Sequence, residues 1–152
     1  MANTQAMCSS FLGELMTATH NFTTSTGNSF KAALYLASAT VNASTTAYSS
    51  SNEVTGTNYV AGGVTVTNGT SPLSSNTSTT AGVGYWTPSA SITYTNVTLT
   101  TAFDAVLIYN SSASNKAVSV HTFGSQTVTA GTFTLTMPSN TTSTALLRLA
   151  TT

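Results

Sequence analysis

The sequence predicts an all-β protein: one antiparallel β-sandwich of about eight short strands, preceded by an amphipathic helix. Short alternating apolar segments, bounded by turn residues, recur from Phe30 to Leu149. No helix-length pattern lies between them, which argues against parallel βαβ units. A chain of 152 residues suffices for one domain with one core. We therefore expect a helix and linker over residues 1–29 and the sandwich over residues 30–152.

The first stretch has the three- and four-residue spacing of an amphipathic helix. Asn3 or Thr4 can cap its start, and about four turns would end before the polar residues 21–29. Its apolar positions are Met7, Cys8, Phe11, Leu12, Leu15 and Met16. Such a stripe needs a partner, either the protein's own sheet or another subunit. Met7, Phe11, Leu12 and Leu15 are therefore candidate interface residues.

From Phe30 onward the apolar period changes to two. Residues 30–37 predict a half-buried strand, and Gly62-Gly63 starts a short strand over 64–67. A Ser/Thr/Asn/Gly loop follows over 68–84, long enough to be functional or mobile. Two strands, 92–95 and 97–100, are separated by Asn96, where we expect a bulge or a turn.

The second half gives the clearest strand pattern. Residues 102–109 hold the most continuous apolar run, which is typical of the centre of a sheet. A polar hairpin loop over 110–115 leads into a returning strand over 117–123. Strands over 126–129 and 132–137 flank a turn at Ala130-Gly131, and Pro138 stops the second of them. A last strand is expected over 145–149.

The charged fraction is 4%, whereas a typical soluble domain has about 25%. The charged residues are Lys31, Lys116, Arg148, Glu14, Glu53 and Asp104. Thr, Ser and Asn supply 68 of the 152 residues. No basic patch can neutralise phosphates, so nucleic-acid binding is not expected. A neutral surface gives little charge repulsion and suits a protein in contact with other subunits, although a Thr-rich surface can also solvate itself.

Cysteine content and hydropathy indicate the cellular compartment in which the chain folds. Cys8 is the only cysteine, which excludes an internal disulfide. The first residues lack the basic and apolar regions of a secretory signal, and no segment approaches the roughly 20 apolar residues of a membrane helix. The Asn-x-Ser/Thr triplets, which are acceptor sites for N-glycosylation in secreted proteins, arise by chance in a chain this rich in serine and threonine and need not be glycosylated. We expect synthesis and folding in a cytoplasm, with no membrane partner.

The residues that could carry chemistry are few and scattered. His20 and His121 lie in different contexts, and neither is at metal-ligand spacing from a cysteine or a carboxylate. Glu14 falls on the polar face of the helix, and Asp104 is interpreted as a strand-end residue that bonds a turn backbone. A Gly-x-Ser-x-Gly elbow and a phosphate-binding glycine loop are both absent. We predict no catalytic, metal-binding or cofactor-binding residue, and hence no enzyme.

Aromatic residues gather in the middle third of the chain. They are Tyr48, Tyr59, Tyr85, Trp86 and Tyr94. In sandwich loops such residues can stack on sugars or bind a protein partner, which makes Trp86 a candidate interface residue. The other interpretation is that Trp86, followed by Thr87-Pro88, packs into the core at the edge of a sheet.

One segment carries a family resemblance. The pattern Glu53-Val54-x-Gly56-x-x-Tyr59-x-x-Gly62-Gly63, followed by Trp86 and by Ala102-Phe103-Asp104, resembles small virion proteins of tailed bacteriophages. The likeness extends over residues 30–149. It implies a jelly-roll or related β-sandwich, glycines that shape turns, and a Glu53 that bonds backbone amides. It implies no binding residue.

The resemblance also implies a role. Its first form is a capsid cement or decoration protein that binds and stabilises the major capsid shell, with the major capsid protein and a second or third copy of itself as partners. The alternative is a tail or fibre component that contacts other tail proteins, with receptor binding through Trp86 and the tyrosines. A glycan hydrolase is the third and weakest hypothesis. We expect the protein on the capsid surface rather than the tail, after synthesis in the host bacterial cytoplasm.

Overall fold

The computed structural model describes residues 2–75 and 82–151 and consists of two antiparallel sheets and one short helix, with 44% of residues in strands and 6% in the helix. The all-β class is thereby confirmed. The elements in chain order are β1 (Ala6–Met7), α1 (Ser9–Met16), β2 (Phe30–Leu36), β3 (Val64–Thr65), β4 (Leu73–Ser74), β5 (Val83–Trp86), β6 (Ile92–Asn110), β7 (Lys116–Leu135) and β8 (Leu147–Ala150).

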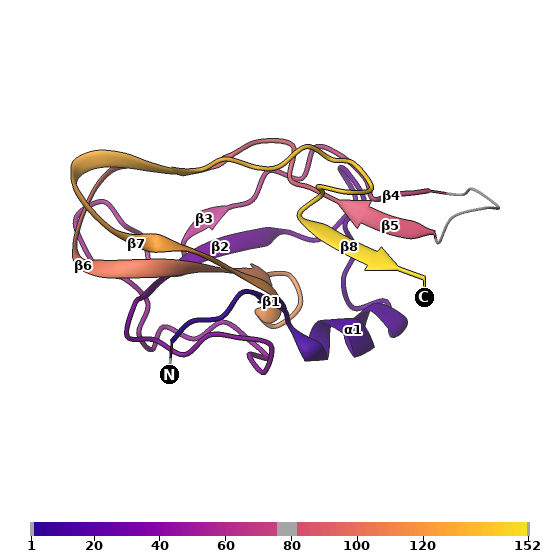
Figure 1. The fold of residues 1–152 in the computed structure, drawn as a ribbon, viewed down its shortest axis with the longest axis horizontal. Coiled ribbons are helices and arrows are strands. Elements are labelled where there is room, and N and C mark those ends of the chain that lie inside the picture. The colour runs from indigo at the N-terminus through magenta and orange to yellow at the C-terminus, as the bar shows by residue number, and fades with distance from the viewer. Residues whose placement is uncertain (1, 76–81, 152) are drawn as a thin grey trace.

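The strands form two sheets that lie next to each other. The larger has the order β1-β7-β6-β2-β3, and the smaller has the order β4-β5-β8. Figure 1 shows the smaller sheet at one end of the molecule, above α1 and beside the C-terminus. The fold therefore has a strand-rich body and an end formed by three short strands and the helix.

A single long hairpin builds most of the body. β6 has 19 residues and β7 has 20, and they pair from Asn110↔Lys116 at the loop to Ile92↔Leu135 at the far end. The hairpin bends back over itself in Figure 1, where β6 and β7 curve at the left and return across the top. Register shifts between Tyr94 and Phe103 accompany this bend, as expected when bulges let a strand turn.

Because of this bend, the second half of the chain has fewer and longer strands than the sequence pattern predicts. The three strands expected over 92–109 are one strand, and so are the three expected over 117–137. The bulge expected at Asn96 is confirmed, with a φ of 51°. The turn expected at Ala130-Gly131 is wrong: Ala130 has a φ of 44°, but the strand continues through it. Local twist at these positions is absorbed without ending the strand.

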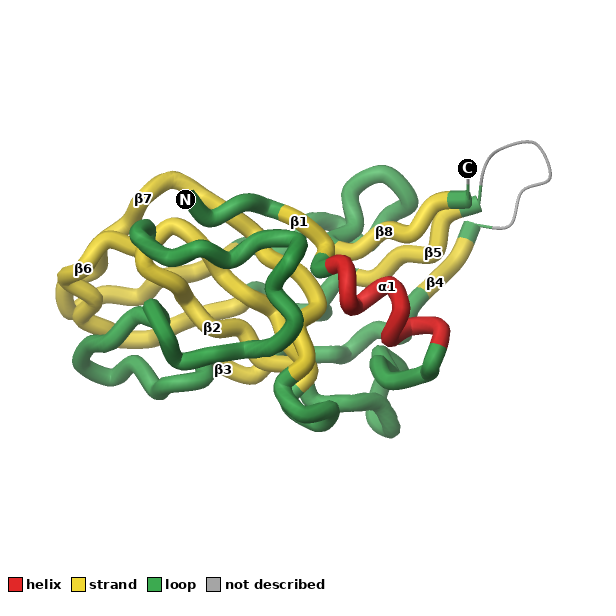
Figure 2. The backbone as a smooth tube through the Cα atoms, turned by 90° about the horizontal axis from the view of Figure 1, so that it is seen from below, coloured by secondary structure: helices red, strands yellow, loops and turns green. Residues whose placement is uncertain are grey.

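Strand β2, which lies between β6 and β3, is buried on both faces, so the prediction of a half-buried strand is wrong. Ala32, Ala33, Leu34 and Tyr35 are each at most 2% exposed. One face looks toward the folded-over half of the hairpin. The other is crossed by the segment over residues 37–63, which Figure 2 shows lying across the strands. The period-two pattern cannot reveal this third layer, because it assigns the Ala and Tyr residues at the intervening positions to an outward face.

The start of the chain differs from the expected four-turn helix. Ala6 and Met7 form an edge strand against Val120 and Ser119 of β7, and the helix begins only at Ser9. Asn3 does not cap it. Its Nδ2 donates to the carbonyl oxygen of Leu36 and to Asp104 Oδ1, and its Oδ1 accepts from the N–H of Val41. These tertiary hydrogen bonds outweigh the weak propensity of a short helix.

The N-terminal segment shares the core of the sandwich. Cys8 is fully buried and Phe11 is 2% exposed, and both belong to the same cluster as the strands β2, β6 and β7. Residues on both sides of the boundary expected at residue 29 therefore contribute to one buried cluster. Of the two partners considered for the helix, the protein's own core takes Phe11.

Candidate functional site

Three residues of the resemblance motif, Glu53, Tyr59 and Gly62, meet beneath the larger sheet. Glu53 is 5% exposed, and its Oε1 accepts from the Tyr59 hydroxyl at 2.7 Å and from the Gly62 N–H at 2.8 Å. Its Oε2 accepts from the Tyr48 hydroxyl at 2.6 Å. The prediction that Glu53 bonds a backbone amide is confirmed at Gly62. The two tyrosines were not predicted as its partners.

This cluster is suited to holding a loop and not to chemistry. Burial, followed by the hydrogen bond to Glu53, raises the pKa of Tyr48 and of Tyr59 above the ordinary phenol value. Both hydroxyls therefore stay protonated and donate to the carboxylate. The Tyr48 ring stacks on Tyr109 at a centroid distance of 4.7 Å, and the Tyr109 hydroxyl donates to the Gly62 carbonyl. Together these contacts fix the segment over residues 37–63 to the sheet.

The glycines of the motif are required by close backbone approach. Gly63 has a φ of +71°, and a Cβ there would collide with the carbonyl oxygen of Ala32. A Cβ at Gly56 would collide with the carbonyl oxygen of Thr98. The glycines of the motif thus serve the fold by allowing close backbone contacts, as the resemblance implies.

A second polar cluster joins the helix to the hairpin loop, and it pairs His20 with a carboxylate that the sequence spacing did not indicate as its partner. His20 Nε2 lies 2.7 Å from Glu14 Oε2, and Lys116 Nζ lies 2.6 Å from Glu14 Oε1. The Nδ2 of the buried Asn110 lies 3.1 Å from His20 Nδ1. An amide nitrogen only donates, so Nδ1 accepts, and Nε2 carries the proton that is donated to Glu14.

The charges of this cluster are internally balanced. Burial raises the pKa of Glu14, but the hydrogen bonds from Lys116 and His20 outweigh it, and the net pKa is lowered. Burial, followed by the charge of Glu14, raises the pKa of Cys8 to about 11. The thiol is therefore protonated at neutral pH and is a poor nucleophile. This cluster positions the helix against the start of β7.

His121 is the remaining residue that could do chemistry. Its Nε2 lies 2.9 Å from the Oγ of Ser119, two positions away on the same strand, and burial lowers the pKa of His121 to about 4. Ser119 is 1% exposed, and no hydrogen bond within the described ranges joins His121 to a carboxylate. The pair lacks the orienting third group of a nucleophilic site.

Asp104 was expected at a strand end, yet it lies inside β6, where it accepts a hydrogen bond from Asn3.

Two other kinds of site, a metal centre and a membrane-spanning helix, concern residues 2–75 and 82–151. No group of three or more His, Cys, Asp or Glu side chains is arranged there to hold a metal ion. No helix in those ranges is long and apolar enough to span a membrane.

Trp86 lies in the core, in agreement with the second interpretation of its sequence context. It is 2% exposed, and its Nε1 donates to Asn68 Oδ1 and to the carbonyl oxygen of Thr70, both at 3.0 Å. The rings of Phe22 and Phe30 pack against it. Its indole face is not open to a sugar.

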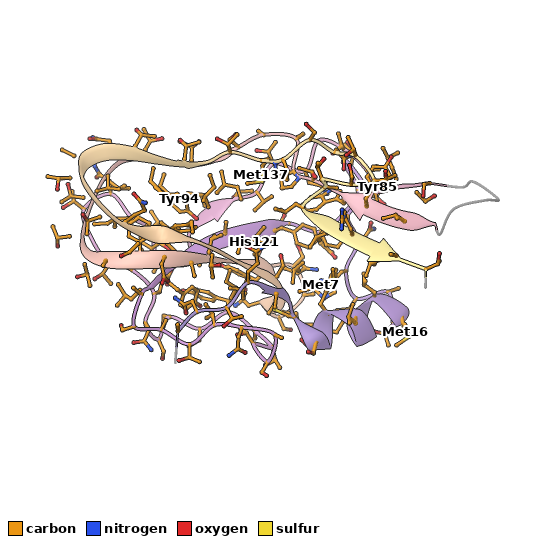
Figure 3. All side chains as sticks on the ribbon, in the orientation of Figure 1. Met7, Met16, Tyr85, Tyr94, His121 and Met137 are labelled. Carbon is orange, nitrogen blue, oxygen red and sulfur yellow. The ribbon has the colours of Figure 1, made fainter. Side chains whose placement is uncertain are left out.

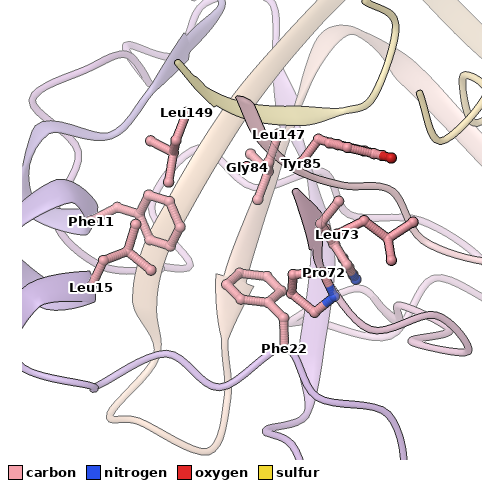
Figure 4. A pocket seen from close by; sticks show the side chains of 10 residues that line it. Phe11, Leu15, Phe22, Pro72, Leu73, Gly84, Tyr85, Leu147 and Leu149 are labelled. Atoms are coloured by element: carbon pink, nitrogen blue, oxygen red, sulfur yellow. The ribbon is translucent and has the colours of Figure 1, made fainter. Parts of the chain in front are cut away.

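The surface feature that stands out is apolar and lies between α1 and the smaller sheet. Here a pocket of about 140 Å³ opens to solvent. Figure 4 shows the side chains that line it. Its lining includes Phe11, Leu15, Phe22, Trp86, Leu147 and Leu149. Large apolar side chains are exposed on the elements around it: Leu12 (46%), Met16 (86%), Leu73 (51%) and Leu149 (42%). We call the pocket and these four residues the apolar end.

The apolar end contains part of the predicted interface set. Phe11 and Leu15 line its pocket and Leu12 is exposed beside it. Met7 does not belong to it: this half-buried residue of β1 lines a separate groove with His121 and Arg148. Sequence reasoning missed Leu73 and Leu149. Both lie on outer strands of a three-stranded sheet, and the order of those strands is not readable from the sequence.

Comparison with known proteins found no relative. No protein-family model matches the chain, and neither the curated proteins nor the solved structures contain a match.

Proposed function

We propose that this protein is a non-enzymatic structural protein of a virion, and that it acts as a capsid cement or decoration protein. The observation that carries the proposal is the state of the charged side chains. There are only six of them, and five make internal contacts. The jelly-roll assignment belongs to the same proposal, supported by the two antiparallel sheets.

The exterior consists mostly of hydroxyl, amide and apolar groups; among the charged residues Arg148 is exposed and Lys116 is partly exposed. Glu14 binds Lys116, Glu53 binds Tyr48, and Asp104 binds Asn3. The Arg148 guanidinium donates to the carbonyl oxygen of Ser143. Neighbouring subunits can approach such a surface with little charge repulsion and without desolvating many ions. This is a useful property in a subunit that is packed among many copies of another protein.

A cement protein stabilises a shell by adding many weak contacts, whose effect multiplies when one module bridges two shell subunits. The proposed partner is the major capsid protein. The decisive measurement is quantitative mass spectrometry of purified heads lacking tails, with copies counted against the major capsid protein. We expect a copy number that is a fixed fraction of the shell subunits. A protein absent from heads, or present only in tailed particles at a few copies, would contradict the proposal.

A second experiment tests the stabilising role. Heads assembled without the protein are mixed with the purified chain, and the temperature of shell disruption is measured. We expect a higher temperature that saturates at the copy number found in native heads. Serum albumin at the same concentration is the control, because nonspecific crowding would act equally in both samples.

A tail or fibre role with receptor binding is the second candidate, and one groove favours it. Between β3 and the first half of β6 lies a groove of about 300 Å³, lined by Asn58, Tyr59, Thr65 and Thr95 among others. Hydroxyl and amide groups beside an aromatic ring suit a sugar. Glycan-array binding that is lost on Thr65→Val or Asn58→Ala would support this role. Trp86→Ala is a poor probe, because that residue belongs to the core.

A further inference from the structure

We propose that the apolar end is a self-association surface: in a two-fold dimer, Met16 of each copy enters the pocket of the other copy. The inference stands on the geometry of this end and does not require the virion role. It names the occupant of the pocket as a side chain of a second copy of this chain.

The pocket owes its space to a glycine. Leu149 pairs with Gly84, and Leu147 pairs with Trp86, so these four positions share one face of the smaller sheet. A Cβ at Gly84 would meet nothing closer than the Leu149 carbonyl oxygen at 3.9 Å, and its φ is not in the left-handed region. The backbone would therefore accept a side chain at position 84, and its absence leaves the pocket open.

The side chain proposed to fill the pocket lies beside it. Phe11 and Leu15 are four residues apart and line the pocket, while Leu12 and Met16 are four apart and form the next stripe of the helix. Met16 is 86% exposed, the highest value among the exposed large apolar residues described. Figure 3 shows it at the end of α1, on the side of the molecule that carries the smaller sheet.

The sizes match. A dry apolar cavity of about 150 Å³ in another protein is enough to bind benzene. The pocket here is about 140 Å³, and an unbranched methionine side chain is smaller than benzene and adapts readily to an irregular space. The lining side chains are apolar except for Trp86 and Tyr85: the indole N–H of Trp86 is already bonded, and the Tyr85 hydroxyl points away from the pocket in Figure 4. A polar or charged side chain would therefore find little to bond to there.

The charge distribution favours a second copy as the partner. A two-fold interface places a surface against itself, so any charge on it faces the same charge on the partner. The only charge of α1, Glu14, is turned inward to Lys116 and His20. The only charge of β8, Arg148, lines a groove that excludes Leu149. The apolar end is thus charge-free and can meet its own copy without repulsion.

Sedimentation velocity over a concentration series tests the proposal with the full chain. We expect the wild type to show a monomer–dimer equilibrium. Met16→Asp places a charge on an exposed position and should raise the dissociation constant by about tenfold or more. Gly84→Leu fills the pocket from within and should weaken association to a similar degree. Val60→Asp, at another exposed apolar residue (71%), should leave the dissociation constant unchanged.

The outcomes are distinct. Dimerisation that is weakened by both Met16→Asp and Gly84→Leu supports the proposal. A chain that is monomeric at every concentration, or a trimer, overturns it, as does a dimer that neither variant weakens. If the wild type is monomeric but Met16→Asp abolishes binding to heads, the apolar end serves the capsid and the second copy is excluded. A wild type that forms the dimer but does not bind heads would count against the virion role alone.

Discussion

Glu14 Oε1 and Lys116 Nζ lie 2.6 Å apart, although 102 residues separate them in the chain. The contact joins the N-terminal helix to the start of β7. Through Glu14 Oε2 it continues to His20, whose other nitrogen accepts from Asn110 at the end of β6. The position of α1, and with it the apolar end, therefore depends on a polar cluster at the tip of the long hairpin.

The lowered pKa of Glu14 predicts how stability depends on pH. A carboxyl group whose pKa is lower in the folded than in the unfolded state stabilises the fold above its ordinary pKa of 4.5. That contribution is lost as pH falls below 4.5 through the folded pKa. Urea unfolding of the wild type and of Glu14→Gln from pH 6 to pH 3 measures it. The wild type should lose more stability than the variant over this range, and equal losses would contradict the assignment.

Removing the partner of Glu14 should have a modest effect. Lys116 is partly exposed, with 39% of its side chain accessible, so solvent screens its ion pair. We expect Lys116→Met to lower the free energy of unfolding at pH 7 by at most about 1 kcal/mol. Added salt should narrow the difference between the two proteins. A loss several times larger would mean that Lys116 supports the hairpin loop by other contacts.

The buried Glu53 should matter more. Glu53→Gln keeps the size of the side chain but replaces one carboxylate oxygen by an NH2 donor. Because the Gly62 N–H can only donate, the amide oxygen must face Gly62, and the charge-assisted hydrogen bond that the Tyr48 hydroxyl donates to Glu53 is lost. We expect a loss of about 1–3 kcal/mol, and a smaller loss of about 1 kcal/mol for Tyr48→Phe. The double variant should lose less than the sum of the two, because both changes remove the same hydrogen bond. Additive losses in urea unfolding would show that Glu53 and Tyr48 act independently.

The strands of this protein follow from its sequence better than their arrangement does. β2 and the hairpin loop after Asn110 were predicted because a period of two and a polar turn are local signals. At the bend in the hairpin the sequence predicts breaks between separate strands, since Asn96 and Gly131 signal a turn whether or not the strand resumes. The merging of β6 depends on pairing with β7, and that information is not local.

The polar clusters were the least predictable feature. Glu14 and Lys116, like Asn3 and Asp104, are about a hundred residues apart, and no spacing rule joins them. The Glu53 cluster was partly predictable, because Glu53, Tyr59 and Gly62 lie within ten residues and belong to the motif. Only the helical part of the apolar end could be predicted from the sequence. There the spacing of Leu12, Leu15 and Met16 indicates an apolar stripe that is too wide for the protein's own core to bury completely.

The close approach at Gly63 predicts a large effect from a small change. Gly63→Ala sets a Cβ against the carbonyl oxygen of Ala32 at a φ of +71°, so β3 must move away from β2. We expect a loss of more than about 1 kcal/mol. Gly13→Ala is the matched control, since a Cβ at this helical position meets nothing within 4 Å. It should stabilise by about 0.5–1 kcal/mol, and thermal unfolding with opposite signs for the two variants checks both expectations.

Because the indole N–H of Trp86 is hydrogen-bonded, we predict that replacing Trp86 lowers the free energy of unfolding more than replacing Tyr85 does. Trp86→Phe removes the donor shared by Asn68 Oδ1 and the Thr70 carbonyl, and it shrinks a ring packed against Phe22 and Phe30. The unpaired acceptors and the lost volume should together lower the free energy of unfolding by about 2–4 kcal/mol. The neighbouring Tyr85→Phe is the control, because its hydroxyl makes no hydrogen bond to another described residue, and its effect should stay within about 0.5 kcal/mol. Equal effects would mean that these hydrogen bonds do not stabilise the junction between the core and the smaller sheet.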